Sequence, residues 1–192
     1  IGAPIDIPTN CPSCGSVLEE KGESKILQCN NTAGCSEQTS RRLDHWVSRG
    51  GADIEGLSTS TLEKLEESGR VKSPSDIYTL EVSDIENLEG MGKRSAENII
   101  QAIDDKKDLG LRKAIVAWSI PNASEGTAKR LCRNGYESPE QIAAATPEEL
   151  ARVEDVGQVV AESLHTFFND PKTVEEVEKL RNAGVNLDVL NE

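Results

Sequence analysis

Four of the five cysteines lie within the first 35 residues, and their spacing is typical of a metal site. Cys11 and Cys14 form a Cys-Pro-x-Cys-Gly knuckle, and Cys29 and Cys35 complete the pattern C-x2-C-x14-C-x5-C. Four thiolates satisfy tetrahedral zinc at about 2.3 Å and leave no open position for water. The sequence therefore predicts one structural zinc per chain. The alternative is a pair of disulfides in a secreted module, but such a knuckle is more typical of metal binding.

The elements that must position these cysteines are a short hairpin and a helix. The hairpin is expected between the two cysteine pairs, with Val17-Leu18 on one arm, Gly22 in the middle and Ile26-Leu27 on the other arm. From Ser36 the pattern becomes helical and ends at a Gly-Gly pair. Residues 1–50 are predicted to form a zinc finger with a connecting helix. A module this small has no core of its own, so the metal is expected to supply its folding energy.

A second kind of chemistry, anion binding, is predicted where Leu88-Glu89-Gly90-Met91-Gly92 leads directly into an amphipathic helix. Glycine permits a sharp turn where a Cβ would clash, and the first amides of the next helix then point outward together. Such amides bind anions. Lys93 and Arg94 stand where the helix dipole disfavours cations, which suits an external anion docked beside them. The alternative is a tight turn with two solvated cations.

The same turn recurs because the chain repeats itself. Residues 73–97 align with residues 138–162 at a shift of 65, and residues 54–65 align with residues 120–131 at a shift of 66. Such self-similarity indicates a repeat architecture. It predicts four helix–turn–helix units arranged as two tandem pairs.

The repeats are expected to form an all-α domain, 51–192, with its two pairs at about 51–119 and 120–184. Short helices are expected over residues 59–68, 75–80, 83–88, 93–106, 110–118, 125–134, 139–145, 147–152, 158–169 and 172–183. Hydroxyl side chains are predicted to cap helices at Ser73, Ser75, Ser83, Ser138 and Thr146.

The four turns differ in quality as anion sites. The third turn has no glycine, and Gly126 is expected to compensate with two nearby cations. The fourth turn keeps only its second glycine, and its Asp155 is expected to repel phosphate. The predicted anion-binding residues of the four turns are Gly56, Ser58, Gly90, Gly92, Lys93, Arg94, Ser124, Gly126 and Gly157.

Composition limits how this chain binds a partner. The net charge is −13, so long-range electrostatic steering towards DNA is poor and binding must come from local amides and a few placed cations. Only 3% of the residues are aromatic, which predicts an aliphatic core. No apolar run reaches the length of a membrane span. The chain opens at Ile1 without an initiator methionine and is expected to be a piece of a larger protein.

Together these features resemble the C-terminal half of the bacterial NAD-dependent DNA ligases. The matching stretches are Ile7-Pro8-Thr9-x-Cys11-Pro12-x-Cys14-Gly15, Asp53-Ile54-Glu55-Gly56-Leu57, Leu88-Glu89-Gly90-Met91-Gly92-Lys93-x-Ser95-Ala96-x-Asn98, Val156-Gly157-x-Val159-Val160-Ala161-Glu162-Ser163 and Leu180-Arg181-x-Ala183-Gly184-Val185. The resemblance covers essentially the whole chain. It implies a mainly α fold, in which a small four-cysteine zinc module precedes an all-α domain of four helix-hairpin-helix motifs in two tandem pairs.

The resemblance implies a fragment that holds nicked double-stranded DNA, without sequence preference, for nick sealing in replication and repair. In that family the hairpins contact the minor-groove side through backbone amides to phosphate. The implied parent enzyme is a cytoplasmic bacterial ligase that uses NAD and magnesium. It would carry adenylation and oligonucleotide-binding (OB) domains upstream and a BRCT domain downstream. The family's adenylated lysine lies in a Lys-x-Asp-Gly motif, which this sequence lacks. The fragment itself is therefore expected to be non-catalytic and to bind neither NAD nor magnesium.

Two other interpretations remain open. One is a helix-hairpin-helix module of a different DNA repair protein, against which the zinc knuckle argues. The other is a protein-interaction scaffold whose acidic surface docks a basic partner. The net charge of −13 favours the scaffold, whereas the complete Gly90-Met91-Gly92 turn disfavours it.

Overall fold

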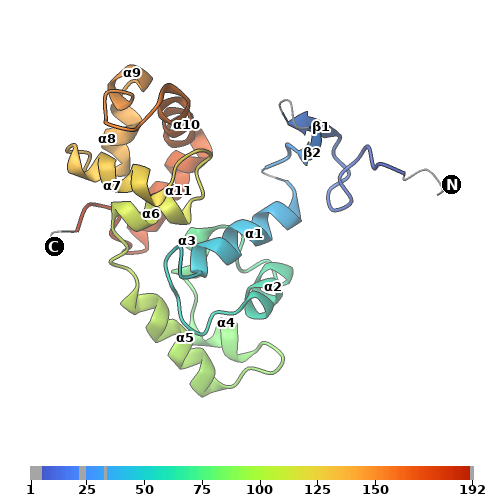
Figure 1. The fold of residues 1–192 in the computed structure, drawn as a ribbon. Coiled ribbons are helices and arrows are strands. Elements are labelled where there is room, and N and C mark those ends of the chain that lie inside the picture. Colours follow the sequence, from blue (N-terminus) through green and yellow to red (C-terminus); the bar gives the residue numbers. More distant parts are fainter. Residues whose placement is uncertain (1–5, 22–24, 33, 191–192) are drawn as a thin grey trace. The chain divides into compact units, whose positions relative to one another are not determined.

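The computed structural model describes residues 6–21, 25–32 and 34–190, and most of its elements are helices (Figure 1). The chain divides into two compact units, one ending at Arg41 and one beginning at Arg42. The division falls inside helix α1 (Ser36–Val47), whereas the sequence suggests a boundary at residue 50. The predicted domain limits stay a prediction.

The first unit contains the expected hairpin. Strands β1 (Leu18–Lys21) and β2 (Ile26–Cys29) pair antiparallel, with Leu18 opposite Cys29. Val17 precedes β1 and forms an isolated bridge with Asn10. The predicted place of Gly22 in the middle of the hairpin lies outside the described residues. The hairpin therefore brings Cys29 close to the segment that follows the first cysteine pair.

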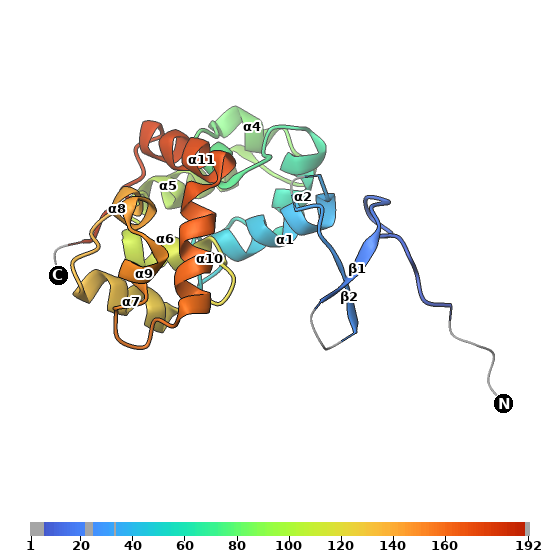
Figure 2. The ribbon, with the colours of Figure 1, turned by 90° about the horizontal axis from the view of Figure 1, so that it is seen from above.

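The named elements of the second unit are all helices over its described residues, which confirms the predicted mainly α fold. Its helices after α1 are α2 (Thr59–Glu67), α3 (Pro74–Ile77), α4 (Val82–Glu86), α5 (Lys93–Asp105), α6 (Leu111–Ala117), α7 (Glu125–Arg133), α8 (Pro139–Ala144), α9 (Pro147–Leu150), α10 (Gln158–Asn169) and α11 (Pro171–Asn182). Only Asp170 separates α10 from α11 (Figure 2). Over the described residues, none of the helices is both long enough and apolar enough to span a membrane.

Three of the five predicted helix caps are confirmed. Ser73, Ser138 and Thr146 are N-cap residues with extended backbone. The prediction is wrong for Ser75 and Ser83, which lie inside α3 and α4. In both cases the helix begins earlier. Ser73 is already the N-cap of α3, and Glu81 is the N-cap of α4, where its amide donates to the Asp84 carboxylate at 2.8 Å. A proline at the first helical position fixes the start of α3 one residue before Ser75.

The core of the second unit is mainly aliphatic, as the composition predicts, but its few aromatic residues cluster. Trp46 of α1 and Trp118 after α6 have ring centroids 5.8 Å apart. Trp118 also meets Phe168 of α10 edge to face at 5.5 Å, and Phe167 lies 5.9 Å away. Such tilted arrangements are the favoured geometry for aromatic pairs. The cluster ties together three helices that are far apart in sequence.

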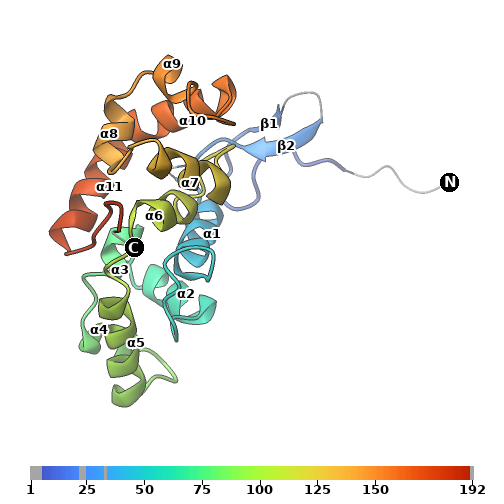
Figure 3. The ribbon, with the colours of Figure 1, turned by 60° about the vertical axis from the view of Figure 1, so that its left-hand side comes forward.

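The helices of the second unit form two groups. The first group, α2 to α5, contains the second turn between α4 and α5, and the first turn joins α1 to α2. The second group, α6 to α10, contains the third turn between α6 and α7 and the fourth between α9 and α10. Figures 1 and 3 show the first group at one end of this unit and α7 to α10 at the other, with α6 between them. Glu176 of α11 also reaches the first group, because the amide and hydroxyl of Ser75 donate to its carboxylate at 2.7 and 2.9 Å.

The C-terminal segment fixes the connection between the two pairs. The amide of Asn186 donates to the Lys107 carbonyl at 2.8 Å, and the amide of Gly110 donates back to the Asn186 carbonyl at 2.9 Å. Gly110 has a φ of +78°, and a Cβ there would meet Leu190 at 2.9 Å. The connection therefore requires glycine both for its backbone conformation and for the close approach of the C-terminal segment.

Candidate metal centre and anion-binding turns

The four predicted metal ligands come together in the first unit. The sulfur atoms of Cys11, Cys14, Cys29 and Cys35 all lie within 4.8 Å of one another. The Cys11 and Cys35 sulfurs are 3.9 Å apart, and those of Cys14 and Cys29 are 3.5 Å apart. A tetrahedron with metal–sulfur distances of about 2.3 Å has edges of about 3.8 Å, so the cluster can hold a tetrahedral metal ion. These separations are too long for the disulfide alternative, and all four cysteines are free.

The surroundings act differently on two of the cysteines. At Cys29 the hydrogen bond from the Asn31 backbone is outweighed by burial and by the neighbouring Cys14 and Cys11 sulfurs, which raise the pKa of this thiol to about 11. The hydroxyl and amide of Ser16 hydrogen-bond to the Cys14 sulfur and lower the pKa of this thiol to about 6. A turn positions Ser16, because the amide of Cys11 donates to the Ser16 carbonyl at 2.8 Å and Gly15 takes a φ of +73°. Cys35 is buried immediately before α1, so the start of this helix fixes the position of the fourth sulfur.

The four turns of the second unit share one backbone conformation. In each turn a residue with positive φ is followed by an apolar residue and then by the N-cap of a helix. The positive-φ residues are Gly56 (+85°), Gly90 (+79°), Asn122 (+64°) and Asp155 (+58°). The four helices that start from these turns are α2, α5, α7 and α10. The third and fourth turns are therefore less degenerate than their sequences suggest.

The sequence alone does not predict that Asn122 and Asp155 take the conformation of the turn glycine. Asparagine and aspartate are the residues other than glycine that best tolerate the left-handed region. Each occupies the position of Gly90 in its own turn, and this alignment is the signal that could have identified them. Because Asn122 supplies the conformation, the third turn does not need Gly126. Gly126 instead lies in the first turn of α7, where a Cβ would meet the Arg130 guanidinium at 3.0 Å.

The roles of the two glycines in Gly90-Met91-Gly92 differ. The amide of Met91 donates to the Leu88 carbonyl at 3.0 Å, which closes a tight turn around Gly90. Gly92 is the N-cap of α5 in an extended conformation, and a Cβ there would meet no atom within 4 Å. The expectation that both glycines avoid a clash within the turn is therefore wrong for Gly92. Its missing side chain leaves open space in front of the helix.

The N-caps divide the four helix starts into two kinds. Ser58 and Ser124 accept hydrogen bonds from the amides of Thr61 and Thr127 at 3.2 and 3.3 Å, which uses one amide of each helix. α5 and α10 instead begin at Gly92 and Gly157, which offer no side-chain cap.

The glycine-capped helices keep more free donors. Within the part of the chain that the structure describes, no acceptor bonds the first three amides of α5, those of Lys93, Arg94 and Ser95. The same holds for the first three amides of α10. The second turn of each pair therefore presents three free donors to an anion.

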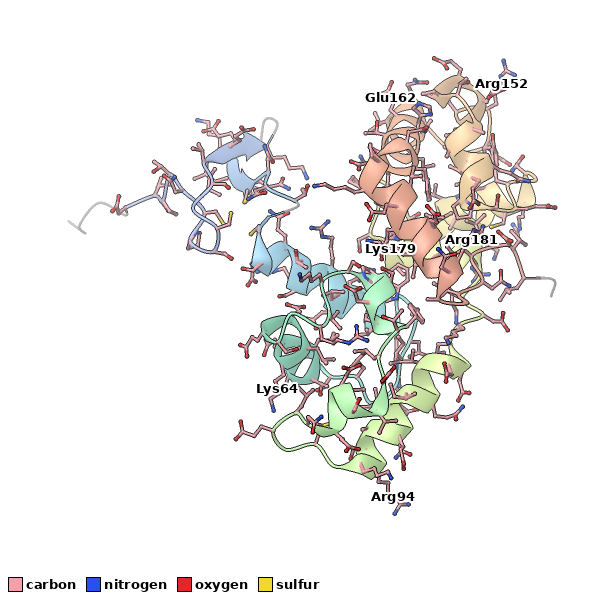
Figure 4. All side chains as sticks on the ribbon, turned by 180° about the vertical axis from the view of Figure 1, so that it is seen from behind. Lys64, Arg94, Arg152, Glu162, Lys179 and Arg181 are labelled. Atoms are coloured by element: carbon pink, nitrogen blue, oxygen red, sulfur yellow. The ribbon has the colours of Figure 1, made fainter. Side chains whose placement is uncertain are left out.

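Cationic side chains near the turns are differently placed. Arg94 projects from the start of α5 and makes no ion pair with a described residue (Figure 4). Lys93 lies 3.9 Å from Glu97 in an exposed pair, which leaves its charge largely available. Lys64 donates to the Glu89 carbonyl at 2.7 Å and so links α2 to the second turn. The start of α5 therefore carries two cations, Lys93 and Arg94, beside its free amides.

The comparisons with known proteins agree with this geometry. Residues 52–105 match the family described as "SAM-like Helix-hairpin-helix tandem", and residues 113–177 match "Helix-hairpin-helix motif". DNA ligase 1 of Nocardia farcinica is 45% identical over 193 residues, which cover 100% of this chain and 29% of that protein. The chain is homologous to part of a DNA ligase. A DNA ligase of Phocaeicola vulgatus is 35% identical over 98% of this chain, and one of Aquifex aeolicus is 36% identical over 96%.

The match covers nearly all of this chain but only part of each ligase. The chain spans between a quarter and a third of the length of these relatives, with 28% of the Phocaeicola protein and 25% of the Aquifex protein covered. The match over residues 52–105 contains the first and second turns, and the match over residues 113–177 contains the third and fourth. The homologous segment also includes the four cysteines. The predicted fold class and the resemblance to ligases are thus confirmed.

Proposed function

We propose that this chain is the non-catalytic part of an NAD-dependent DNA ligase that holds nicked duplex DNA during sealing. The observation that carries the proposal is the 45% identity to a DNA ligase over the full length of the chain. The Lys-x-Asp-Gly motif is missing from the sequence, so adenylation, with its NAD and magnesium, would belong to other parts of the parent protein. Such a parent would work in replication and repair in the bacterial cytoplasm.

The four-cysteine cluster would bind zinc. Its sulfur separations of 3.5 and 3.9 Å fit a tetrahedral ion, and an all-thiolate set favours zinc over harder cations. With four protein ligands, the ion would order the first unit and activate no water. In the parent protein the module would join the OB domain to the helical unit.

The helical unit would hold DNA through its four turns. Phosphate groups would accept hydrogen bonds from the amides that follow the N-caps, most strongly at α5 and α10, where three amides are free. Phosphate contacts position a protein without reading sequence, which suits an enzyme that seals nicks anywhere. The proposed contact residues are Gly56, Ser58, Gly90, Gly92, Lys93, Arg94, Ser124, Gly126 and Gly157.

The test is binding of the whole chain to nicked duplex of two unrelated sequences, followed by fluorescence anisotropy over a range of salt concentrations. We expect weak binding, roughly 10⁻⁴ to 10⁻⁶ M, because the net charge of −13 opposes approach. If each turn neutralises one phosphate, log K should fall against log salt with a slope of about −3 to −4. Lys93→Glu with Arg94→Glu should lower the affinity equally on both sequences and flatten this slope.

A matched double variant on α11, Lys172→Glu with Lys179→Glu, makes the same charge change away from the turns and should alter both quantities less. Absence of binding to either duplex at low salt would contradict the proposal. It would favour the acidic scaffold, which should then bind a basic protein instead.

A further inference from the structure

An open cleft of about 550 Å³ lies between the first and second turns. Gly56 and Met91 line it from the two turns, and Ser95, Asn98 and Ala102 line it from one face of α5. These three residues of α5 are spaced so that they share one side of the helix. The cleft therefore opens between the two turns of the first pair.

The repeat provides an internal comparison, because the same position in the second pair is bridged. Asn122 stands where the first pair has Gly56, and its carboxamide donates to the Ser163 hydroxyl at 3.1 Å. Asn98 is the counterpart of Ser163 on α5. With no side chain at Gly56 to meet it, the Asn98 carboxamide makes no hydrogen bond to any described residue. The first pair thus keeps open a gap that a side chain crosses in the second pair.

Two further positions are larger and more apolar in the second pair. Val160 takes the place of Ser95, and Phe167 takes the place of Ala102. Phe167 packs into the aromatic cluster, 5.2 Å from Phe168. The first pair instead has small residues at both positions, one of them an exposed hydroxyl. The two pairs share a backbone conformation at their turns, so the open cleft follows from side-chain size.

The chemistry of the cleft indicates what it accepts. Its floor is apolar, formed by Met91, Ala102 and the buried Ile99. Its neutral polar groups can both donate and accept hydrogen bonds; they are Ser95 and Asn98 of α5 and the hydroxyls of Ser58 and Thr61 at the start of α2. Glu55 also lines the cleft, and its negative charge disfavours a phosphate inside. A neutral, partly apolar group with hydrogen-bond acceptors fits this lining best.

We propose that the cleft binds the sugar and minor-groove base edge of one DNA nucleotide whose phosphate lies outside, near the start of α5. The inference rests on the proposed function and goes beyond it, because it makes the first pair a nucleotide-binding element as well as a phosphate-binding one. The sugar packs on Met91 and Ala102, and Ser95 and Asn98 donate to acceptors on the base edge. Every base pair presents acceptors in the minor groove, so these contacts are compatible with any sequence.

The deciding variant is Gly56→Asn, which gives the first pair the residue of the second. Asparagine accepts the positive φ of Gly56, and its Cβ would lie 3.3 Å from Ile99 Cγ1, a tight contact. Its carboxamide should cross the cleft towards Asn98. We expect about a three- to tenfold loss of affinity for nicked duplex in the anisotropy assay, as for one or two lost hydrogen bonds.

Gly135→Asn is the matched control, because Gly135 also has a positive φ (+87°) and open space around its Cβ, away from the four turns. It should bind as the unchanged chain does. Ser95→Val is a second test, since it copies the residue of the other pair at an exposed helix position and should also weaken binding. If Gly56→Asn lowers the unfolding temperature, its loss of affinity could come from misfolding, and Ser95→Val then tests the cleft independently.

The outcomes separate the two proposals. If the unchanged chain binds nicked duplex but Gly56→Asn and Ser95→Val bind equally well, the cleft does not hold a nucleotide, although the turns still bind DNA. If the unchanged chain does not bind DNA, both proposals fail. A shift of the Asn98 side-chain amide resonance on titration with a short nicked duplex would support the cleft directly, and an unmoved resonance would contradict it.

Discussion

Arg130 of α7 and Asp155 of the fourth turn form an ion pair, with 2.8 Å between Nη2 and Oδ2. The pair connects α7, the helix that follows the third turn, to the fourth turn. It also offsets the negative charge of Asp155, which from sequence alone should repel phosphate. Gly126 makes room for the guanidinium, since a Cβ there would lie 3.0 Å from Arg130 Nη1. The fourth turn therefore presents the free amides of α10 beside a neutralised acid.

Removing Arg130 should weaken DNA binding through Asp155. Arg130→Ala leaves an unpaired carboxylate near the amides of α10, so we expect a larger loss of affinity in the unchanged background than in an Asp155→Gly background. The pair is exposed, so its contribution to the free energy of unfolding should be small, about 0 to 1 kcal/mol. A double-mutant cycle by fluorescence anisotropy, with thermal unfolding in parallel, measures both quantities. Equal losses in the two backgrounds would mean that Arg130 acts independently of Asp155.

Substitutions at Gly90 and Gly92 should separate turn formation from ligand contact. Gly90→Ala places a side chain at a φ of +79° and should destabilise the fold by about 1 to 2 kcal/mol. Gly92→Ala meets no atom within 4 Å and has an ordinary backbone, so stability should barely change. If phosphate approaches the start of α5, Gly92→Ala should still weaken DNA binding by crowding it. Unchanged binding by Gly92→Ala would place the phosphate elsewhere.

The metal centre should be structural and confined to the first unit. We expect about one zinc per chain by elemental analysis, lost in Cys11→Ser and in Cys29→Ser together with the order of the hairpin. Cys132→Ser, in helix α7, is the control and should retain the metal. The helical circular dichroism signal of the second unit should persist, because its core is separate. A metal-free native protein would contradict the zinc proposal.

The contact between α11 and α3 should make stability depend on pH. Burial raises the pKa of Glu176, although hydrogen bonds from Ser75 oppose this shift. A carboxyl group whose pKa is raised by folding stabilises the fold most at low pH, and this contribution is lost as pH rises through the raised pKa. Glu176→Gln stays neutral, so its unfolding temperature relative to the unchanged chain should be higher at pH 7 than at pH 4. A difference that is the same at both values would show that the ionisation of Glu176 is unaffected by folding.

Much of this architecture is predictable because it repeats. Helix positions followed from apolar spacing, and most predicted limits lie within one or two residues of the observed ones. The errors at Ser75 and Ser83 arose where helices begin earlier, at a proline in α3 and behind a glutamate cap in α4. Local sequence gives several acceptable caps, and only the hydrogen bonds choose among them.

The turns show what sequence alone leaves out. The number of glycines in each turn predicts that the third and fourth turns bind anions less well than the second. However, Asn122 and Asp155 adopt the same backbone conformation as Gly56 and Gly90. The Arg130–Asp155 pair and the Asn122–Ser163 hydrogen bond join residues 25 and 41 positions apart, and no local pattern indicates them. The charge beside the fourth turn and the bridged gap in the second pair depend on these long-range contacts, so they can be seen only in the three-dimensional structure.

Both tryptophans of the chain, Trp46 and Trp118, belong to one aromatic cluster in the helical unit. Intrinsic fluorescence therefore comes almost entirely from that unit and provides a built-in optical probe of its melting. The four-cysteine unit carries no tryptophan and therefore contributes no tryptophan fluorescence. Tryptophan fluorescence thus reports the melting of the helices without interference from the four-cysteine unit, whose loss of metal is followed separately by elemental analysis.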